Sequence, residues 1–471
     1  EGTNLAHNLP LMSNPHKDPE AANHFREGAR RLWVPLTELR DATGKLQRHA
    51  VAGRPSERDH ALGHRDVSLR EVPKLVSRPV PEQRMDFAQW QRLSPMQAVD
   101  AMFTAVVEAN PHLRPRVGNP DEIRSNRMLR TLEHLKFRVT DPKRGVPESY
   151  DGGVVTALNE EAVASAALAN KGGINIIVTY EAFGIKMHGV VRQEIIFANH
   201  CNEIGRKQGW LSVPLILTSH TWENSKNEVS HQDPAMAESM LGELSDVSRV
   251  MFVPDYNTAA VVTRGAYQTQ GQVWTVVVPK QDAVANLFTP DEATRLLEQG
   301  ALRLDWAGHE LADSKVVLTA VGAYQLEHVL KASARLKERG LPHSVVYMLE
   351  PGRFRAPRSE GEHKHVVAAG IRQQLYPDSA RARVFVTHTR PEPILGTLQT
   401  LNTGAETTCG LGFLGQGGTL TIDGLLFVNR CTWVDVLSEL ARLIGMPREE
   451  FLQADELAVI DRKRSPEGVV F

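Results

Sequence analysis

Short apolar runs alternate with amphipathic stretches between residues 95 and 300. Four of these runs have the length of buried strands, at 174–178, 213–217, 250–253 and 273–278. Helical stretches lie between several of them, and residues 94–97 (Ser-Pro-Met-Gln) open one such helix in the style of a capping box. Strands that alternate with helices predict a parallel sheet covered by helices on both faces.

A similar pattern follows residue 300. Thr289 caps a helix that ends at Gly300, and beyond it we expect strands at 315–321, 344–349, 383–387 and 420–422, with helices at 325–339 and 433–444. The first strand, helix and second strand form a βαβ unit, which is expected to be right-handed. The chain is therefore predicted to be α/β, with a parallel-sheet domain at 81–300, a smaller α/β domain at 301–471 and an extended arm at 1–80.

The arm carries many prolines and charges and little apolar periodicity. One helix is expected at about 19–39. A free tail is one interpretation, but an arm wrapped on the body is favoured, because the tail would otherwise expose the apolar side chains of Leu5, Leu9, Leu11, Leu32 and Trp33.

Composition limits the classes of partner. The net charge of -2 argues against nucleic acid and anionic membrane as partners, so an anionic ligand needs a local basic pocket. No apolar run approaches the length of a membrane span. The three cysteines have no metal-ligand spacing and indicate a reducing compartment, from which we expect a cytoplasmic protein.

Several polar segments could carry chemistry. The loop at 219–234 follows a strand and holds two histidines and a lysine, and its composition leaves a ligand-binding loop and a solvated loop about equally supported. Residues 120–127 favour a turn, and the pair Glu160-Glu161 favours a solvated helix start. Residues 410–415 match G-x-G-x-x-G, but a strand-like run follows instead of a helix, so a loop is favoured over a nucleotide site.

Taken together, these segments resemble the thiamine-diphosphate-dependent phosphoketolase family. Five motifs occur in the family's order: E-G-T-N-L-A-H-N-L-P-L at 1–11, P-D-E-I-R-S-N-R at 120–127, T-Y-E-A-F at 179–183, S-H-T-W with S-H-Q-D-P between 219 and 234, and P-K-Q at 279–281. The resemblance covers residues 1–300 by motif and the remainder by general pattern. It implies a pyrimidine-binding domain of the thiamine-diphosphate type, followed by the C-terminal domain.

The resemblance also implies roles for the cofactor-facing residues. Glu160, or Glu161 if the alignment slips by one position, would be the carboxylate that contacts the aminopyrimidine ring and favours the imino form that activates the cofactor. Phe183 would stack on that ring, because an aromatic face suits a flat heterocycle.

The implied substrate is a ketose phosphate, xylulose 5-phosphate or fructose 6-phosphate. Arg206 and Lys280 are the candidates for holding its phosphate dianion. Neutral donors are expected from Ser125, Tyr180 and Asn227, and His7 and His231 are expected to carry protons. Inorganic phosphate would then capture the two-carbon fragment as acetyl phosphate.

Departures from the family pattern leave alternatives open. Residues 170–174 (Asn-Lys-Gly-Gly-Ile) replace T-G-R-H-G, Lys226 replaces a histidine, and Asn8 and Asn224 replace glutamines. These changes are expected near the substrate, where a charged lysine cannot act as an imidazole does. A paralogue with a transketolase-like or epimerase reaction and a non-catalytic family subunit are the competing hypotheses.

The sequence contains no G-D-G motif, which in the family carries magnesium and the cofactor's diphosphate. No metal ligand is therefore assigned within this sequence. A diphosphate-binding domain is expected either from chain preceding Glu1 or from a separate subunit. Because the family's site forms between subunits, a homodimer or larger oligomer is expected.

Overall fold

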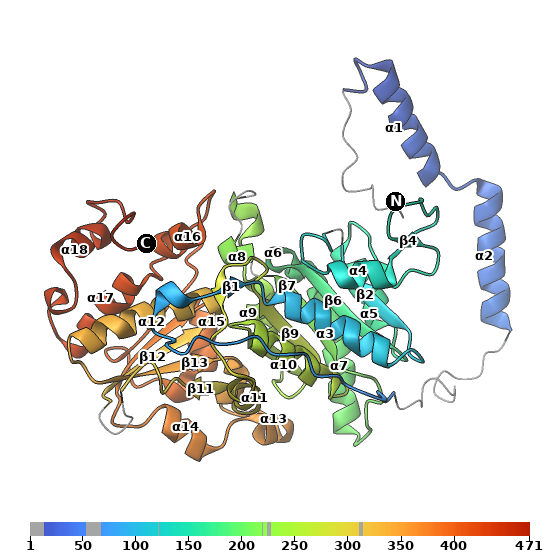
Figure 1. The fold of residues 1–471 in the computed structure, drawn as a ribbon. Helices are drawn as coiled ribbons and strands as arrows, with labels where there is room; N and C mark the ends of the chain where they lie inside the picture. The colour runs from blue at the N-terminus through green and yellow to red at the C-terminus, as the bar shows by residue number, and fades with distance from the viewer. Residues whose placement is uncertain (1–13, 53–66, 121, 219, 224–227, 310–313) are drawn as a thin grey trace.

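A computed structural model describes residues 14–52, 67–120, 122–218, 220–223, 228–309 and 314–471. Two large sheets form its body (Figure 1). The first has eight strands in the order β4-β3-β5-β2-β6-β7-β9-β8, and every pair in it is parallel. Its strands are β2 (Pro115–Gly118), β3 (Phe137–Arg138), β4 (Glu148–Ser149), β5 (Val154–Val155), β6 (Ile174–Tyr180), β7 (Val213–Thr218), β8 (Ser248–Phe252) and β9 (Val273–Val278). The predicted parallel sheet is confirmed.

The second sheet has five strands in the order β11-β13-β12-β14-β15, with β11 antiparallel to β13 and the other pairs parallel. Its strands are β11 (Ala301–Arg303), β12 (Val316–Val321), β13 (His343–Met348), β14 (Ala382–Thr387) and β15 (Thr408–Leu411). We call residues 81–300 the first region and residues 301–471 the second region. The expected strand at 420–422 is wrong, because Thr421 instead caps a helix that begins at Ile422.

Helices cover both faces of each sheet, because their apolar sides pack into two buried layers. One layer contains α3 (Met96–Ala109), α10 (Tyr256–Tyr267), α11 (Pro290–Gln299), α12 (Ala323–Glu338), α16 (Ile422–Val428) and α17 (Trp433–Ile444). The other contains α5 (Glu160–Leu168), α7 (His188–Glu203), α9 (Ala235–Leu241), α14 (Ala369–Leu375) and α15 (Pro391–Thr397). Each layer runs from one sheet to the other, so the two regions share their cores. Smaller helices are α4 (Leu129–Leu135), α6 (Glu181–Gly184), α8 (His220–Glu223), α13 (Glu360–His365) and α18 (Ala454–Ile460). Within the described ranges, no helix is both long and apolar enough to cross a bilayer.

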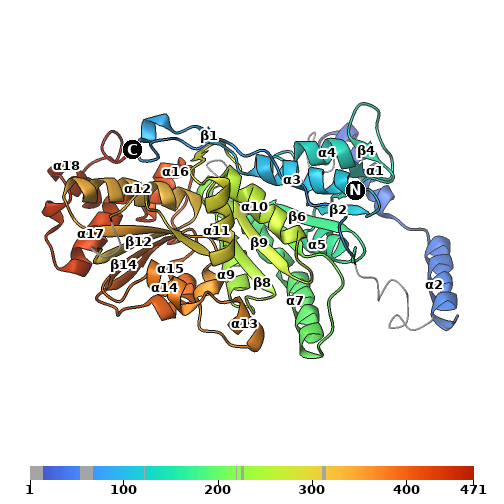
Figure 2. The ribbon, with the colours of Figure 1, turned by 60° about the horizontal axis from the view of Figure 1, so that its bottom comes forward.

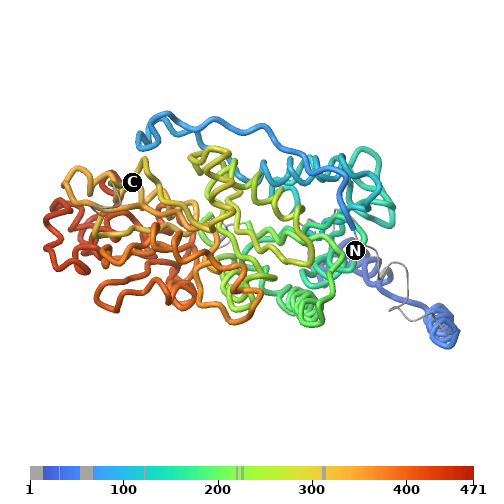
Figure 3. The backbone as a smooth tube through the Cα atoms, turned by 90° about the horizontal axis from the view of Figure 1, so that it is seen from below, coloured from blue at the N-terminus to red at the C-terminus, as the bar shows by residue number. Residues whose placement is uncertain are grey.

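The arm follows the prediction in part. Residues 67–93 run along the body and end in β1 (Arg92–Leu93), which pairs with β10 (Val284–Ala285) (Figures 2 and 3). Asn110 and Asn257 hold this segment by bonding its backbone.

The single helix expected at 19–39 is instead two helices, α1 (Pro19–Leu32) and α2 (Leu36–Val51), because Pro35 interrupts it. Leu32 and Trp33 are exposed, so the prediction that they pack on the body is wrong. Leu5, Leu9 and Leu11 lie outside the described residues.

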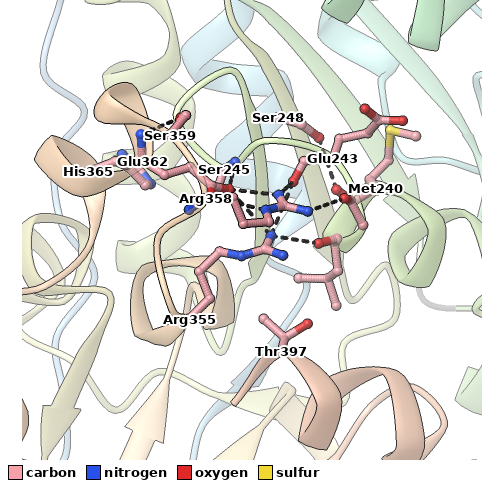
Figure 4. A network of polar contacts seen from close by, with 12 residues as sticks. Met240, Glu243, Ser245, Ser248, Arg355, Arg358, Ser359, Glu362, His365 and Thr397 are labelled. Atoms are coloured by element: carbon pink, nitrogen blue, oxygen red, sulfur yellow. Dashed lines mark hydrogen bonds and ion pairs between the residues drawn. The ribbon is translucent and has the colours of Figure 1, made fainter. Parts of the chain in front are cut away.

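A buried carboxylate joins the two regions in the network of Figure 4. Glu362, at the start of α13, accepts hydrogen bonds from Ser245 N (2.8 Å) and Ser245 Oγ (3.1 Å) in the first region. Arg358 donates to the same carboxylate from its backbone N (2.7 Å) and from its guanidinium. Burial alone would raise the pKa of Glu362, but these bonds outweigh burial and lower the pKa to about 2.

This shift predicts an acid-sensitive interface. The contribution of Glu362 to stability should be complete above its ordinary pKa of 4.5 and should be lost as pH falls from 4.5 to about 2. The difference between a pKa of 4.5 and one of about 2 corresponds to roughly 3–4 kcal/mol. Urea unfolding should show Glu362→Gln destabilising the protein at pH 6 and much less at pH 3. An equal loss at both pH values would contradict the assignment.

Candidate active site

Three loops meet where parallel strands of the first sheet end. Tyr180 is the last residue of β6, α8 follows β7 directly, and Lys280 comes two residues after β9. The carboxyl ends of parallel strands lie at one edge of a sheet, which is where ligands bind in open α/β folds. The structure therefore brings side chains from distant parts of the sequence to one place.

Ser125, Tyr180 and Lys280 form a compact polar group at this edge. The Tyr180 hydroxyl donates to Ser125 Oγ at 2.7 Å, and Lys280 Nζ donates to the same oxygen at 3.2 Å. Lys280 Nζ also lies 4.6 Å from the centroid of the Tyr180 ring. Because Ser125 Oγ accepts both bonds, its own O–H can donate to a ligand.

A buried carboxylate binds the backbone that carries Lys280. Glu223, at the end of α8, accepts hydrogen bonds from Lys280 N (2.9 Å) and Gln281 N (3.3 Å), and also from the Tyr324 hydroxyl in the second region. Burial raises the pKa of Glu223 to about 7 and lowers the pKa of Lys280 to about 8, although the two opposite charges act against both shifts. Both groups therefore titrate near neutral pH.

The second group on this edge contains an imidazole and an aromatic ring. The His231 ring centroid lies 4.7 Å from that of Phe183 and 6.4 Å from that of Tyr180. Ser230 Oγ is 2.9 Å from His231 Nδ1. Burial lowers the pKa of His231, and the cation of Lys186 lowers it further, so the imidazole is neutral at pH 7 and can accept a proton.

Lys186 connects Phe183 with Glu160. Its Nζ lies 4.3 Å from the centroid of the Phe183 ring and 3.2 Å from Glu160 Oε1. Glu160 is the first residue of α5, and its side chain is 12% exposed, whereas the neighbouring Glu161 is an exposed residue. The geometry therefore directs Glu160 toward the aromatic group.

Arg206 lies elsewhere. The helix α7 carries the chain from the carboxyl edge back to the amino edge, and Arg206 follows its end and precedes β7. The length of β7 therefore separates Arg206 from the Tyr180–Lys280 edge, roughly 20 Å at the rise of a strand. The structure does not bring the predicted Arg206 to this site.

The expectation that the substitutions at 170–174 lie near the substrate is also wrong. Asn170 is buried and bonds Arg114 and Asn175 at the amino end of β6, opposite Tyr180. His7, Asn8, Asn224, Lys226 and Asn227 lie outside the described residues.

Two parts of the site were missed by sequence reasoning. Arg127 lies in the same P-D-E-I-R-S-N-R segment as Ser125, pairs with Asp282 at 3.3 Å and lowers the pKa of Lys280 through its charge. The resemblance of this segment to the family motif could have indicated Arg127 as a site residue. Glu223 lies in a segment that was singled out, but its partner Tyr324 belongs to the other region, and no local pattern links the two.

A cavity of about 370 Å³ lies between the regions, with Tyr324 in its wall. Three carboxylates line it, from Asp282, Glu327 and Asp423, against the one guanidinium of Arg92, which pairs with Glu327 at 2.8 Å. Such a lining disfavours a phosphate dianion. The Ser125–Tyr180–Lys280 group is therefore the better phosphate site.

The residues present fit one half of thiamine diphosphate. Glu160 and Phe183 provide a sheltered carboxylate and an aromatic ring beside the same lysine, as an aminopyrimidine requires. Across the described ranges, no group of three or more His, Cys, Asp or Glu side chains could hold a metal ion. The fit is with the pyrimidine half of the cofactor.

Comparison with known proteins agrees with this geometry. Residues 97–269 match the family model of D-xylulose 5-phosphate/D-fructose 6-phosphate phosphoketolase. Over this segment the chain is similar to the phosphoketolases. This match includes Ser125, Glu160, Tyr180 and His231, and Lys280 lies just beyond it.

Curated relatives extend the similarity into the second region. The chain is 25% identical to a probable phosphoketolase of Bifidobacterium animalis subsp. lactis over 391 residues, covering 77% of this chain and 46% of that protein. It is 28% identical to one of Streptomyces avermitilis over 363 residues, covering 74% of this chain and 44% of that protein. The chain thus spans less than half the length of these relatives.

Solved structures show the same fold. A transketolase from Leishmania mexicana superposes with a TM-score of 0.56 at 15% identity, covering 80% of this chain and 47% of that one. A transketolase from Campylobacter jejuni gives a TM-score of 0.53 at 14% identity, covering 76% and 47%. The predicted α/β fold is confirmed.

Proposed function

We propose that this chain is the pyrimidine-binding half of a thiamine-diphosphate enzyme that cleaves a ketose phosphate, xylulose 5-phosphate or fructose 6-phosphate, with inorganic phosphate to give acetyl phosphate and an aldose phosphate. The observation that carries the proposal is one edge of the sheet that holds both the Ser125–Tyr180–Lys280 group and the Glu160–Phe183–His231 group. The match to the phosphoketolase model supports it.

The phosphate end of the substrate would bind at Lys280 and Ser125. The ammonium of Lys280 supplies a point charge, and the Ser125 hydroxyl supplies a neutral donor. Tyr180 fixes Ser125 Oγ, and Glu223 fixes the backbone at Lys280. Arg127 adds a second cation beside this end of the site.

The reacting end would lie between Glu160 and His231. When bound, thiamine diphosphate supplies an electron sink for carbon–carbon bond cleavage. Glu160 would accept an N–H from the heterocycle, Phe183 would support its flat face, and neutral His231 would take a proton from a substrate hydroxyl. His7 and Asn227 remain candidates for a second proton carrier and a further donor.

We also propose that a diphosphate-binding domain or subunit completes the site as its partner. Magnesium would be held by that partner, together with the cofactor's diphosphate. A homodimer or larger oligomer follows if the two halves come from different subunits.

The test is an assay of the chain combined with a phosphoketolase diphosphate-binding domain, thiamine diphosphate, magnesium, phosphate and xylulose 5-phosphate or fructose 6-phosphate. We expect acetyl phosphate to form. Another sugar phosphate without acetyl phosphate would support a transketolase-like or epimerase reaction instead. No turnover of any ketose phosphate and no cofactor binding would support a non-catalytic subunit.

The titration of Lys280 predicts how substrate affinity depends on pH. Its ammonium is lost as pH rises through about 8, while the substrate phosphate is already a dianion. The KM should therefore rise about tenfold between pH 7 and pH 9. Lys280→Arg keeps its charge in this range, so its KM should stay level. The same rise in both enzymes would contradict the role of Lys280.

A further inference from the structure

The glycine-rich segment 410–418 has no role in the function proposed so far. Its first residues close β15, which ends at Leu411, and the next helix, α16, begins only at Ile422. A dinucleotide fingerprint needs a helix that opens within the motif. The segment is therefore a loop, as the sequence predicted, and its contacts show what it does.

The loop is anchored to the second region by one buried side chain. Asn429, at the end of α16, is 1% exposed. Its Oδ1 accepts from Leu414 N at 2.8 Å and from Gln416 N at 3.3 Å, and its Nδ2 donates to Gln416 O at 2.7 Å. The backbone of the loop is thus held in one conformation.

The C-terminal end of the loop is hydrogen-bonded to the segment of the first region that carries His231. Gly418 N donates to Gln232 Oε1 and Gln232 Nε2 donates to Gly418 O, both at 3.2 Å. Gln232 is 2% exposed. A Cβ added at Gly417 would lie 2.0 Å from Gln232 Oε1 and 3.0 Å from Val229 Cγ2, so the Gln232 amide would have to move away from Gly418.

Gln232 directly follows His231 in the sequence. The next residue, Asp233, is also bound by a side chain of the second region. Arg390 pairs with Asp233 at 3.1 Å and with Glu238 at 2.7 Å. The backbone that carries His231 is therefore fixed on its C-terminal side by contacts from another region of the chain. The His231 ring itself lies near the rings of Phe183 and Tyr180.

We infer that the loop 412–418 is a positioning element, which sets the His231 imidazole against the substrate edge through the paired amide of Gln232. The inference rests on the role proposed for His231. It also assigns the second region a part in catalysis, although none of its residues in this contact would touch the substrate. A displacement of about 1 Å at a catalytic group can lower turnover on the order of 100-fold, so such a support matters.

The test compares two glycine-to-alanine variants in the complete enzyme with its diphosphate-binding partner. Gly417→Ala places a methyl group against Gln232, whereas Gly396→Ala, in α15, meets nothing within 4 Å. We expect Gly417→Ala to lower kcat about tenfold or more with little change in KM, and to shift the pH profile of kcat. Amide exchange over 228–234 should become faster in Gly417→Ala and stay unchanged in Gly396→Ala.

A double-mutant cycle completes the test. Gln232→Ser removes the side chain nearest to the added methyl group and leaves the contact with Val229 Cγ2 at 3.0 Å, so Gly417→Ala should cause a much smaller further loss in that background. Exchange and kcat in Gly417→Ala equal to those of Gly396→Ala would overturn the inference. If the parent enzyme makes no acetyl phosphate, faster exchange in Gly417→Ala still supports the positioning contact, and the proposed function alone fails.

Discussion

Glu160→Gln should lower turnover by on the order of 10²–10⁴-fold in the enzyme completed with its diphosphate-binding partner. Glutamine keeps the size of the side chain but cannot accept a proton as a carboxylate does, and it removes the charge that faces Lys186 Nζ at 3.2 Å. Stability should change little, because Glu160 lies at the first turn of a helix that Asn159 still caps. Steady-state kinetics with saturating cofactor measures the loss.

The neighbouring carboxylate gives a matched control. Glu161→Gln changes an exposed side chain one position further along α5 and should leave kcat unchanged. Full activity in Glu160→Gln with loss in Glu161→Gln would mean that the two positions are exchanged. Full activity in both variants would remove the catalytic assignment from this helix.

Glu350→Gln should destabilise the protein by about 3–5 kcal/mol, because breaking a buried ion pair leaves its partner charged and unpaired. Glu350 is fully buried and accepts from Arg249 at 2.9 and 2.6 Å, across the boundary between the two regions. Arg353 and His365 bond the same carboxylate. Burial alone would raise the pKa of Glu350, but the charge and hydrogen bonds of Arg249, together with the contact with His365, outweigh burial and hold the pKa well below its ordinary value.

Urea unfolding measures this loss, and Glu360→Gln is its control. Glu360 pairs with Lys364 at 2.6 Å on the same stretch of chain, but both side chains are exposed. The urea midpoint of the Glu360→Gln variant should therefore equal that of the parent protein. Equal midpoints for the two variants would show that the Arg249–Glu350 pair does not stabilise the contact between the regions.

Elements with a strong local pattern were predictable. The strand β9 and the helix α17 have the predicted bounds, and α11 lies between Thr289 and Gly300 as expected, because buried runs and capping residues are local signals. The expected strand at 420–422 (Leu-Thr-Ile) was wrong, since so short a run does not distinguish a strand from the cap and first residue of a helix.

The grouping of side chains at the candidate site was predictable where it depends on motif residues. Ser125, Tyr180 and Lys280 come from three separate motifs and meet at one sheet edge, as the resemblance implied. The bonds from Tyr324 to Glu223 and from Gly418 to Gln232 could not be predicted, because each joins residues about 100 or more positions apart across two regions. Arg206 was expected at the substrate site, but the structure places it at the other end of β7. Its position could not be predicted because it depends on the length of α7.

We propose that this chain holds the pyrimidine half of a site and that a partner supplies the diphosphate half. Calorimetric titration with thiamine diphosphate and magnesium tests it most directly, with the chain alone and with the chain joined to a phosphoketolase diphosphate-binding domain. We predict tight binding only for the combination, with binding weakened by Phe183→Ala. Tight binding to the chain alone, or binding by the combination that Phe183→Ala does not change, would contradict this division of the cofactor site between two partners.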